Sequence, residues 1–126
     1  MAKAVKLRRY TYCTKVGKDG CVNTEGAEHA DAGWMHWCPG CEQMHAIAVE
    51  HTFPNGAKWT FDGNTLQPTF APSIKIDYQM CGKSVVCHYF IHNGMIKFCE
   101  DSTHALSGQN VPLPDVPKYI AADDAT

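Results

Sequence analysis

The run Trp37-Cys38-Pro39-Gly40-Cys41 constrains the fold of this chain more than any other feature of its sequence. Two residues between the thiols allow both sulfurs to face one ion, while backbone amides of the turn point towards them. Proline fixes the turn, and glycine permits its unusual dihedral angles. The run therefore predicts the knuckle of a zinc ribbon, in which Cys38 and Cys41 bind one Zn²⁺ at a turn between two strands.

Two other interpretations fit the same pair of cysteines, a redox pair and inert thiols. A thioredoxin-like redox pair normally opens a helix in a βαβ unit, and this sequence lacks the pattern of such a unit. No apolar run follows the charged N-terminus, so we expect no signal peptide and a cytoplasmic, reducing location. Seven cysteines are also an odd number, which complete disulfide pairing cannot use. Metal ligands with spare buried thiols are therefore favoured.

Two cysteines need further ligands to complete a zinc site. His45 lies four residues beyond Cys41 and can fold back onto the same ion. Cys87 and His88 are adjacent, so on a strand they face opposite sides and at most one reaches the zinc. The predicted ligands are Cys38, Cys41, His45 and Cys87, and whether His45 or Cys87 completes the site is open. The remaining cysteines are weaker candidates, more simply read as small buried side chains: Cys13, Cys21, Cys81 and Cys99.

Glycine and proline divide the chain into short segments, which is typical of strands joined by turns. We expect strands over 4–12, 34–37, 44–52, 58–64, 73–79, 85–91 and 95–98. Asn93-Gly94 is the strongest hairpin signal. Residues 13–33 read as a long loop, and Ser102 or Thr103 as the cap of a short helical turn. The predicted fold class is mainly β (β-rich α+β), a small antiparallel sheet domain with a zinc-knuckle hairpin.

The length and charge of the chain exclude several classes. At 126 residues it is long enough for one domain with a modest core. A formal net charge of -2 argues against a nucleic-acid partner. No stretch reaches the roughly 18 apolar residues of a membrane-spanning helix, so we expect no membrane partner. The oligomeric state is left open by the sequence.

Several side chains suggest hydrolytic chemistry. Asp101, Ser102 and His104 fall within four residues, and Ser73 and His88 are polar residues in otherwise apolar strands. A nucleophile needs a base within hydrogen-bond reach and a group that orients the base. Either serine is a candidate nucleophile, either histidine a candidate base, and Asp101 or Asp62 the orienting group. Alternatively a zinc-bound water is the nucleophile, and a histidine or Glu42 moves the proton. The simpler structural interpretation makes Ser102 a helix cap and Ser73 a solvent-facing strand residue.

Taken together, these segments resemble a known family. The matching runs are Trp37-Cys38-Pro39-Gly40-Cys41 with His45, Trp59-x-Phe61-Asp62-Gly63, Pro68-Thr69-x-x-Pro72-Ser73-Ile74, Cys87-His88-x-Phe90 with Gly94, Asp101-Ser102-x-His104-x-Leu106-x-Gly108, and Val111-x-Leu113-Pro114. They resemble the DUF6527 family, small proteins frequent in tailed phages and also found in bacteria. Within the single domain 1–126, the resemblance makes 33–117 the family core, 1–32 an N-terminal strand and loop, and 118–126 a tail.

The resemblance implies an activity as well as a fold. Members of the family are similar to peptidases predicted beside bacterial ubiquitin-like conjugation genes, where a protease would process or remove the ubiquitin-like protein. The implied substrate is a protein or peptide, such as a ubiquitin-like tail. The positions that carry the resemblance are Cys38, Cys41, His45, Ser73, Cys87, His88, Asp101, Ser102 and His104.

Two hypotheses of different class follow. The first is a zinc-containing peptidase in which His88 and His104 act as base and orienting group, with Ser102 or a zinc-bound water as the nucleophile. The second is a non-catalytic phage protein, stapled by zinc, that acts in assembly or in binding a host protein. Exposed tryptophans among Trp34, Trp37 and Trp59 would then form its binding face.

Overall fold

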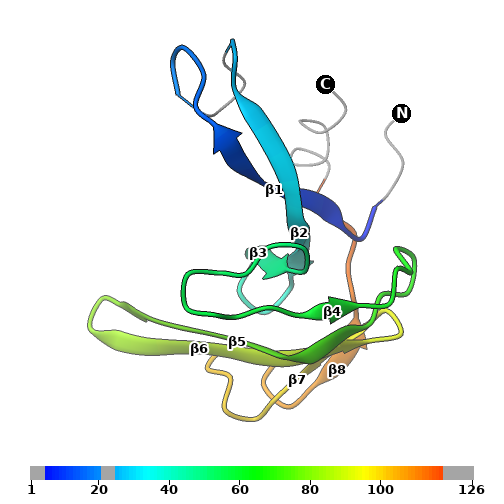
Figure 1. The fold of residues 1–126 in the computed structure, drawn as a ribbon. Helices are drawn as coiled ribbons and strands as arrows, with labels where there is room; N and C mark the ends of the chain where they lie inside the picture. Colours follow the sequence, from blue (N-terminus) through cyan, green and yellow to red (C-terminus); the bar gives the residue numbers. More distant parts are fainter. Residues whose placement is uncertain (1–4, 21–24, 118–126) are drawn as a thin grey trace.

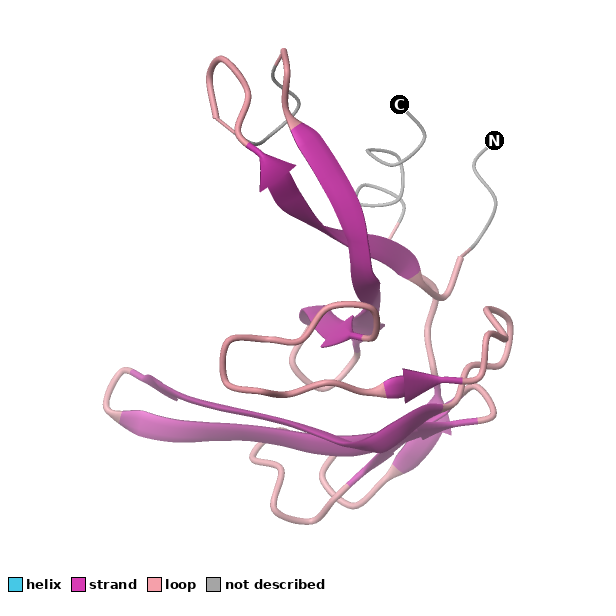
Figure 2. Ribbon diagram, in the orientation of Figure 1, coloured by secondary structure: helices cyan, strands magenta, loops and turns pink. Residues whose placement is uncertain are grey.

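A computed structural model describes residues 5–20 and 25–117 and shows two antiparallel sheets (Figures 1 and 2). The first sheet has the order β1-β2-β3, and the second has the order β4-β5-β6-β7-β8. Their bounds are β1 Arg8–Lys15, β2 Glu28–Cys38, β3 Gln43–Ala48, β4 Thr60–Phe61, β5 Phe70–Met80, β6 Lys83–His92, β7 Met95–Phe98 and β8 Asn110–Pro112. The described residues contain no helix, so none is long and apolar enough to cross a membrane.

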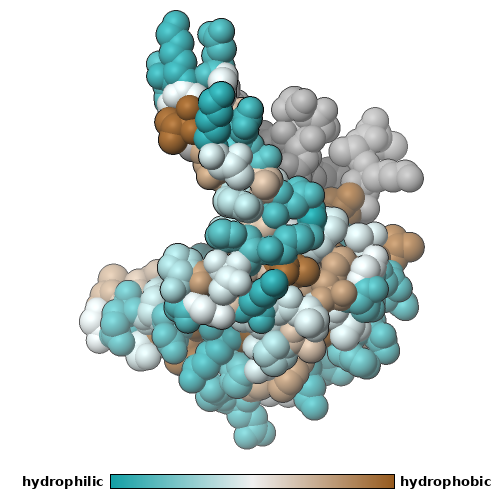
Figure 3. Space-filling view, in the orientation of Figure 1, coloured by the Kyte–Doolittle hydropathy of each residue, from teal (hydrophilic) through white to brown (hydrophobic). Residues whose placement is uncertain are grey.

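The knuckle of the first sheet is seated on the second. In Figure 1 the β1–β2 ribbon rises away from the five-stranded sheet, while the end of β2 and β3 lie close to it. Figure 3 shows mainly hydrophilic residues towards the tip of the rising ribbon. At its base, β2 and β3 pair from Gly33↔Ala48 to Cys38↔Gln43. This register delivers the Cys-Pro-Gly-Cys turn to the side of the five-stranded sheet that carries the core.

The core follows from the two-residue period of the strands. In β6, Cys87, Tyr89 and Ile91 are buried, whereas the alternate residues Phe90 and His92 are exposed. The inward side chains of β6 and β7 therefore form one apolar face, and the alternate side chains form a separate outer face. The buried cluster consists of Leu7, Cys38, Ile47, Phe70, Ile74, Cys87, Tyr89, Ile91, Ile96, Phe98 and Leu113.

The predicted fold class and hairpin are confirmed. The chain is all-β in its described part, and β6 and β7 form a hairpin at Asn93 and Gly94, whose φ angles are 49° and 77°. Positive φ at both positions is what the Asn-Gly signal predicts. The fold also carries a long pairing of β5 with β6, where the sequence suggested two shorter strands.

Two predictions about local structure are wrong. Residues 13–33 are not one long loop, because β1 continues to Lys15 and β2 already begins at Glu28. The expected helical turn near Ser102 is absent, and residues 104–108 instead form non-helical turns. The physical reason is that the hydroxyls of Ser102 and Thr103 bond to the backbone of β6 rather than to a helix start. The predicted tail 118–126 and the candidate Cys21 lie outside the described residues.

Candidate functional site

The Cys-Pro-Gly-Cys turn presents one thiol from each of its ends. Cys38 is the last residue of β2, and the backbone amide of Cys41 donates to Cys38 Sγ at 3.4 Å. Glu42 closes the turn with a φ of 55° and donates its amide to Cys38 O at 2.8 Å. The turn thus places amide hydrogens next to sulfur, as the knuckle prediction requires.

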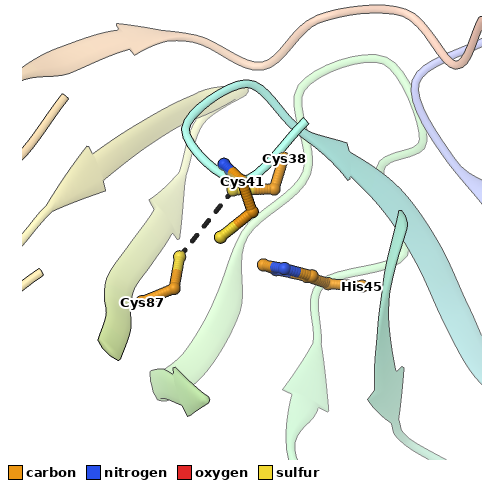
Figure 4. A group of neighbouring side chains, drawn as sticks. All are labelled: Cys38, Cys41, His45 and Cys87. Atoms are coloured by element: carbon orange, nitrogen blue, oxygen red, sulfur yellow. Dashed lines mark hydrogen bonds between the residues drawn. The ribbon is translucent and has the colours of Figure 1, made fainter. Parts of the chain in front are cut away.

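A third thiol reaches the knuckle from the second sheet. Cys87 of β6 faces inward, and its Sγ lies 3.7 Å from Cys38 Sγ (Figure 4). His45 of β3 joins them, and the ligand atoms of Cys38, Cys41, His45 and Cys87 all lie within 4.8 Å of one another. The four predicted zinc ligands are therefore brought together, both His45 and Cys87 included.

The three thiols influence one another's ionisation. The hydrogen bond from Cys87 lowers the pKa of Cys38 to about 6, against the effect of burial, and amides of the turn contribute further. Burial and the neighbouring Cys38 charge raise the pKa of Cys41 to about 11. The Cys38 hydrogen bond and burial also raise the pKa of Cys87. One thiolate is thus tolerated here, and a cation would be needed to stabilise three.

His45 is oriented by a hydrogen-bonded series that sequence reasoning missed. Its Nδ1 lies 3.1 Å from Tyr89 Oη, which in turn lies 2.6 Å from His36 Nε2. His45 Nε2 is buried with no hydrogen-bond partner. A buried imidazole nitrogen without a partner is costly unless its lone pair binds a metal. The alternation of side chains along a strand could have revealed these two residues. His36 lies two residues before Cys38, and Tyr89 lies two residues after Cys87, so each faces the same side as its cysteine.

Both histidines of this series are held neutral. Burial, reinforced by His45, lowers the pKa of His36 to about 3. Burial and the nearby His104 lower the pKa of His45 to about 4. A neutral imidazole is the form that binds a metal, with its other nitrogen hydrogen-bonded to an outer group such as the Tyr89 hydroxyl.

His104 lies with the cysteines and not with His88. Leu106 N donates to its Nδ1 at 3.2 Å, so the ring proton is on Nε2, 3.5 Å from Cys87 Sγ. Gly40 makes room for this ring, since a Cβ at Gly40 would lie 2.3 Å from His104 Cε1. Burial lowers the pKa of His104. The structure therefore places His88 and His104 in different clusters. It does not bring them together as base and orienting group.

A second cluster lies on the outer face of the five-stranded sheet. Ser73 Oγ lies 3.1 Å from His88 Nε2, and His88 Nδ1 lies 3.1 Å from each carboxylate oxygen of Asp101. The three residues come from β5, from β6 and from the loop after β7. The ligand atoms of His88, Cys99 and Asp101 also lie within 4.8 Å of one another. Cys99, a weaker ligand candidate in the sequence, therefore borders this cluster and not the knuckle.

An irregularity of β5 places Ser73 beside His88. The pairing runs from Phe70↔Ile91 to Ile74↔Tyr89, so three residues of β5 stand opposite the single residue Phe90. Such bulges bend a strand and redirect its side chains. Trp59 holds the backbone here, because its Nε1 donates to Ser73 O at 3.1 Å. Trp59 itself is half-buried and packs against the core.

Ser102 holds the backbone of β6 where β7 no longer pairs with it. Its Oγ accepts from His88 N and donates to His88 O, both at 3.0 Å. In the same way, the hydroxyl of Thr103 bonds to the N–H and C=O of Val86, two residues before His88 in the strand. Because Asp101 directly precedes Ser102 in the chain, these hydrogen bonds also hold the backbone of Asp101 close to β6. The hydroxyl of Ser102 therefore faces main-chain groups, whereas the hydroxyl of Ser73 faces an imidazole.

The remaining candidates lie apart from both clusters. Asp62 accepts from Asn64 N and Thr69 N within its own turn, at 3.0 and 3.3 Å. Cys81 is exposed in the turn between β5 and β6, and Glu42 is exposed at the knuckle. Neither Asp62 nor Glu42 is brought to His88.

Comparison with known protein families relates the chain to a family of proteases. A family model described as "Bacterial ubiquitination-like system serine protease (BubE)" matches residues 13–99, more than half of the chain. The matched region includes Ser73, His88 and the four clustered metal-ligand candidates. The match supports the predicted relation to peptidases of ubiquitin-like conjugation systems, while the assignment to DUF6527 stays a prediction. No curated protein and no solved structure gives a significant match.

Proposed function

Because the chain belongs to the family of bacterial ubiquitination-like system serine proteases, we propose that it cleaves protein substrates with Ser73 as nucleophile, His88 as base and Asp101 as the orienting group. The observation that carries the proposal is the series from Ser73 Oγ to His88 Nε2 and from His88 Nδ1 to Asp101, each step 3.1 Å long. Hydroxyl, imidazole and carboxylate in this order are the groups of a serine-protease triad.

The protein groups perform the reaction as follows. Asp101 accepts a hydrogen bond from His88 Nδ1–H, which keeps the proton on Nδ1 and leaves the lone pair of Nε2 facing Ser73 Oγ. As Ser73 Oγ attacks the substrate carbonyl carbon, Nε2 takes the hydroxyl proton and then gives it to the leaving amine. The C–N bond breaks and an acyl ester remains on Ser73. A water molecule, deprotonated by the same nitrogen, then hydrolyses the ester and restores the hydroxyl.

Ser73 is preferred to Ser102 as nucleophile on the grounds of geometry. The hydroxyl of Ser102 is engaged with the N–H and C=O of His88, and the side chain is 7% exposed. Ser73 lies on the outer face, where the side chain of His88 is 25% exposed and that of Asp101 is 49% exposed. A substrate backbone can approach this face without entering the core. The substrate we propose is the tail of a ubiquitin-like protein, or a protein joined to it.

We also propose that Cys38, Cys41, Cys87 and His45 hold a structural Zn²⁺. Three thiolates and one imidazole are a closed tetrahedral zinc set. The unpartnered, buried Nε2 of His45 fits this role. When bound, the ion would neutralise thiolate charge and contribute folding free energy. A closed set offers substrate no coordination position, which is why we assign bond cleavage to Ser73 rather than to a zinc-bound water.

A fluorophosphonate probe tests the nucleophile directly. Such a probe phosphorylates an activated serine with loss of fluoride, and mass spectrometry of the digested protein locates the adduct. We expect labelling of Ser73, loss of labelling in Ser73→Ala and His88→Ala, and retention in the matched surface control Ser84→Ala.

The same experiment separates the alternatives. An adduct on Ser102 would overturn the assignment of Ser73. Peptide cleavage without any adduct, abolished by a chelator, would favour the zinc-bound water. Neither labelling nor cleavage, in a folded zinc-containing protein, would favour the non-catalytic interaction module.

A further inference from the structure

The outer face of the five-stranded sheet continues past the triad into an apolar hollow. The hollow has a volume of about 500 Å³ and is lined by Thr69, Phe70, Ala71, Phe90, Ile91, His92 and Lys97. Phe90 is 45% exposed, so part of its ring is accessible to a ligand in the hollow. Apolar hollows of roughly 300–1,000 Å³ with a few polar groups are the usual form of a binding site.

Phe90 is shared by this hollow and by a smaller one beside it. The second hollow, of about 300 Å³, is lined by Phe90, His92, Asn93, Met95, Lys97 and Asn110. Phe90, His92 and Lys97 therefore border both depressions. Its ring also stacks near that of His88, with centroids 6.4 Å apart and an interplanar angle of 28°. The hollow therefore adjoins the proposed catalytic histidine through Phe90.

The strand geometry fixes where this hollow lies relative to Ser73. Ala71 is two residues before Ser73 on β5, and Phe90 is two residues after His88 on β6. Because β5 and β6 are antiparallel, both steps lead in the same direction across the sheet. Along β6, where the pairing with β7 is regular, a strand rises by about 3.3 Å per residue, so Phe90 lies about 7 Å from His88 of the triad. An extended substrate covers that distance in two residues.

We propose that this hollow binds an apolar side chain of the cleaved polypeptide, two residues from the scissile bond, with Phe90 as the specificity-determining wall. The proposal rests on the proposed function of the triad. In an extended chain, every second side chain faces the same way, so the residue that reaches the hollow points towards the sheet. Lys97, at both depressions, adds a positive charge suited to a carboxylate on the same substrate segment.

Peptides with a single moved leucine test the spacing. The probes are glycine-serine peptides in which one leucine occupies each position in turn, with cleavage sites mapped by mass spectrometry. We expect cleavage to follow the leucine at a separation of two residues. Cleavage that ignores the leucine, or that occurs beside it, would overturn the proposal.

Phe90→Ala tests whether Phe90 is the specificity-determining wall of the hollow. For the leucine peptide we expect kcat/KM to fall about tenfold or more, since most of the apolar contact is lost. For the matched peptide with alanine at that position, the fall in kcat/KM should be much smaller, because alanine makes little contact with the wall. An equal loss on both peptides would mean that Phe90 only positions His88, and would overturn the specificity role. Leu66→Ala, which removes a side chain that is 78% exposed outside the hollow, is the matched control.

A binding measurement keeps this proposal separate from the triad. In the Ser73→Ala protein, fluorescence anisotropy of a labelled leucine peptide should show binding that Phe90→Ala weakens and Leu66→Ala does not. If the peptide binds in this way but the Ser73→Ala protein still cleaves it at the unaltered rate, the triad proposal is wrong and the hollow proposal stands. If Ser73→Ala abolishes cleavage but Phe90→Ala does not change peptide binding, the hollow proposal is wrong and the triad proposal stands.

Discussion

Cys87 and His88 are neighbours in β6, yet they belong to two clusters of opposite character. Cys87 is fully buried among thiols and imidazoles, whereas the side chain of His88 is 25% exposed beside Ser73 and Asp101. In the inner cluster Cys38, His45 and Cys87 are buried and Cys41 is partly exposed, whereas the outer cluster is accessible to a polypeptide. The difference shows how the alternation of one strand can separate a structural centre from a reactive one by a single residue.

The two clusters also share a loop, which couples their positions. Asp101 orients His88 on the outer face, and His104, three residues later, lies 3.5 Å from Cys87 on the inner side. Ser102 lies between them and holds the backbone of β6. Substitutions of the exposed polar side chains of the outer cluster should affect cleavage first. Changes in the inner cluster should affect stability first and, through this loop, cleavage second.

Asp101→Asn should have the largest effect on cleavage. An amide at this position favours the wrong tautomer of His88, and the general triad loses about 10⁴-fold in kcat by this change. We expect a loss of that order in peptide hydrolysis, with the melting temperature and zinc content unchanged. Loss of bound zinc in this variant would contradict the separation of the two clusters.

Cys87→Ser should have the largest effect on stability. It removes a zinc ligand from the core, and we expect the free energy of unfolding to fall by about 4 kcal/mol or more, with loss of the ion. Denaturant unfolding and metal analysis measure both quantities, and a strong chelator should reproduce the effect in the unaltered protein. The exposed Cys81 supplies the control Cys81→Ser. Unchanged stability and metal content would mean that these thiols are inert.

Tyr89→Phe should lower the zinc affinity of the inner cluster. The phenol hydroxyl bridges His45 and His36, and loss of an outer hydrogen bond to a metal-binding histidine costs about 10–100-fold in affinity. Competition with a chromophoric chelator measures the zinc affinity, and Tyr78→Phe is the matched control. An affinity equal to that of the unaltered protein would exclude an orienting role for the hydroxyl.

Ser102→Ala should have the smallest effect of the four. The hydroxyl satisfies the N–H and C=O of His88, so we expect a loss of about 1–2 kcal/mol in stability. Cleavage should fall only in part, because Ser73 and the imidazole remain. Ser84→Ala is the matched control. Complete loss of cleavage at an unchanged melting temperature would instead point to Ser102 as the nucleophile.

Much of the inner cluster could be predicted because its signals are local. Cys38 and Cys41 lie in one turn, and His45 follows on the return strand. The Asn-Gly hairpin is equally local and was predicted at its correct position. His36 and Tyr89 were missed because a histidine and a tyrosine within apolar strands carry no motif, although alternation puts them on the faces of Cys38 and Cys87.

The outer cluster could be predicted only as a set of alternatives. The sequence offered Ser73 or Ser102, His88 or His104, and Asp101 or Asp62. In the structure Ser102 lies close to Asp101 along the chain but bonds to the backbone, whereas the distant Ser73 reaches the imidazole. Proximity in sequence was misleading because the extra residues of β5, opposite Phe90, are visible only once the strands are paired.

By itself the sequence determined the strand class, the knuckle and the residue types available for chemistry, because these depend on spacing within a few residues. The tertiary structure decided which of them meet. The pairing of β5 with β6 brought Ser73 to His88, and the seating of the knuckle on β6 brought Cys87 and His104 to Cys38 and Cys41. Such contacts depend on register and sheet packing between distant segments, which no local pattern of residues encodes.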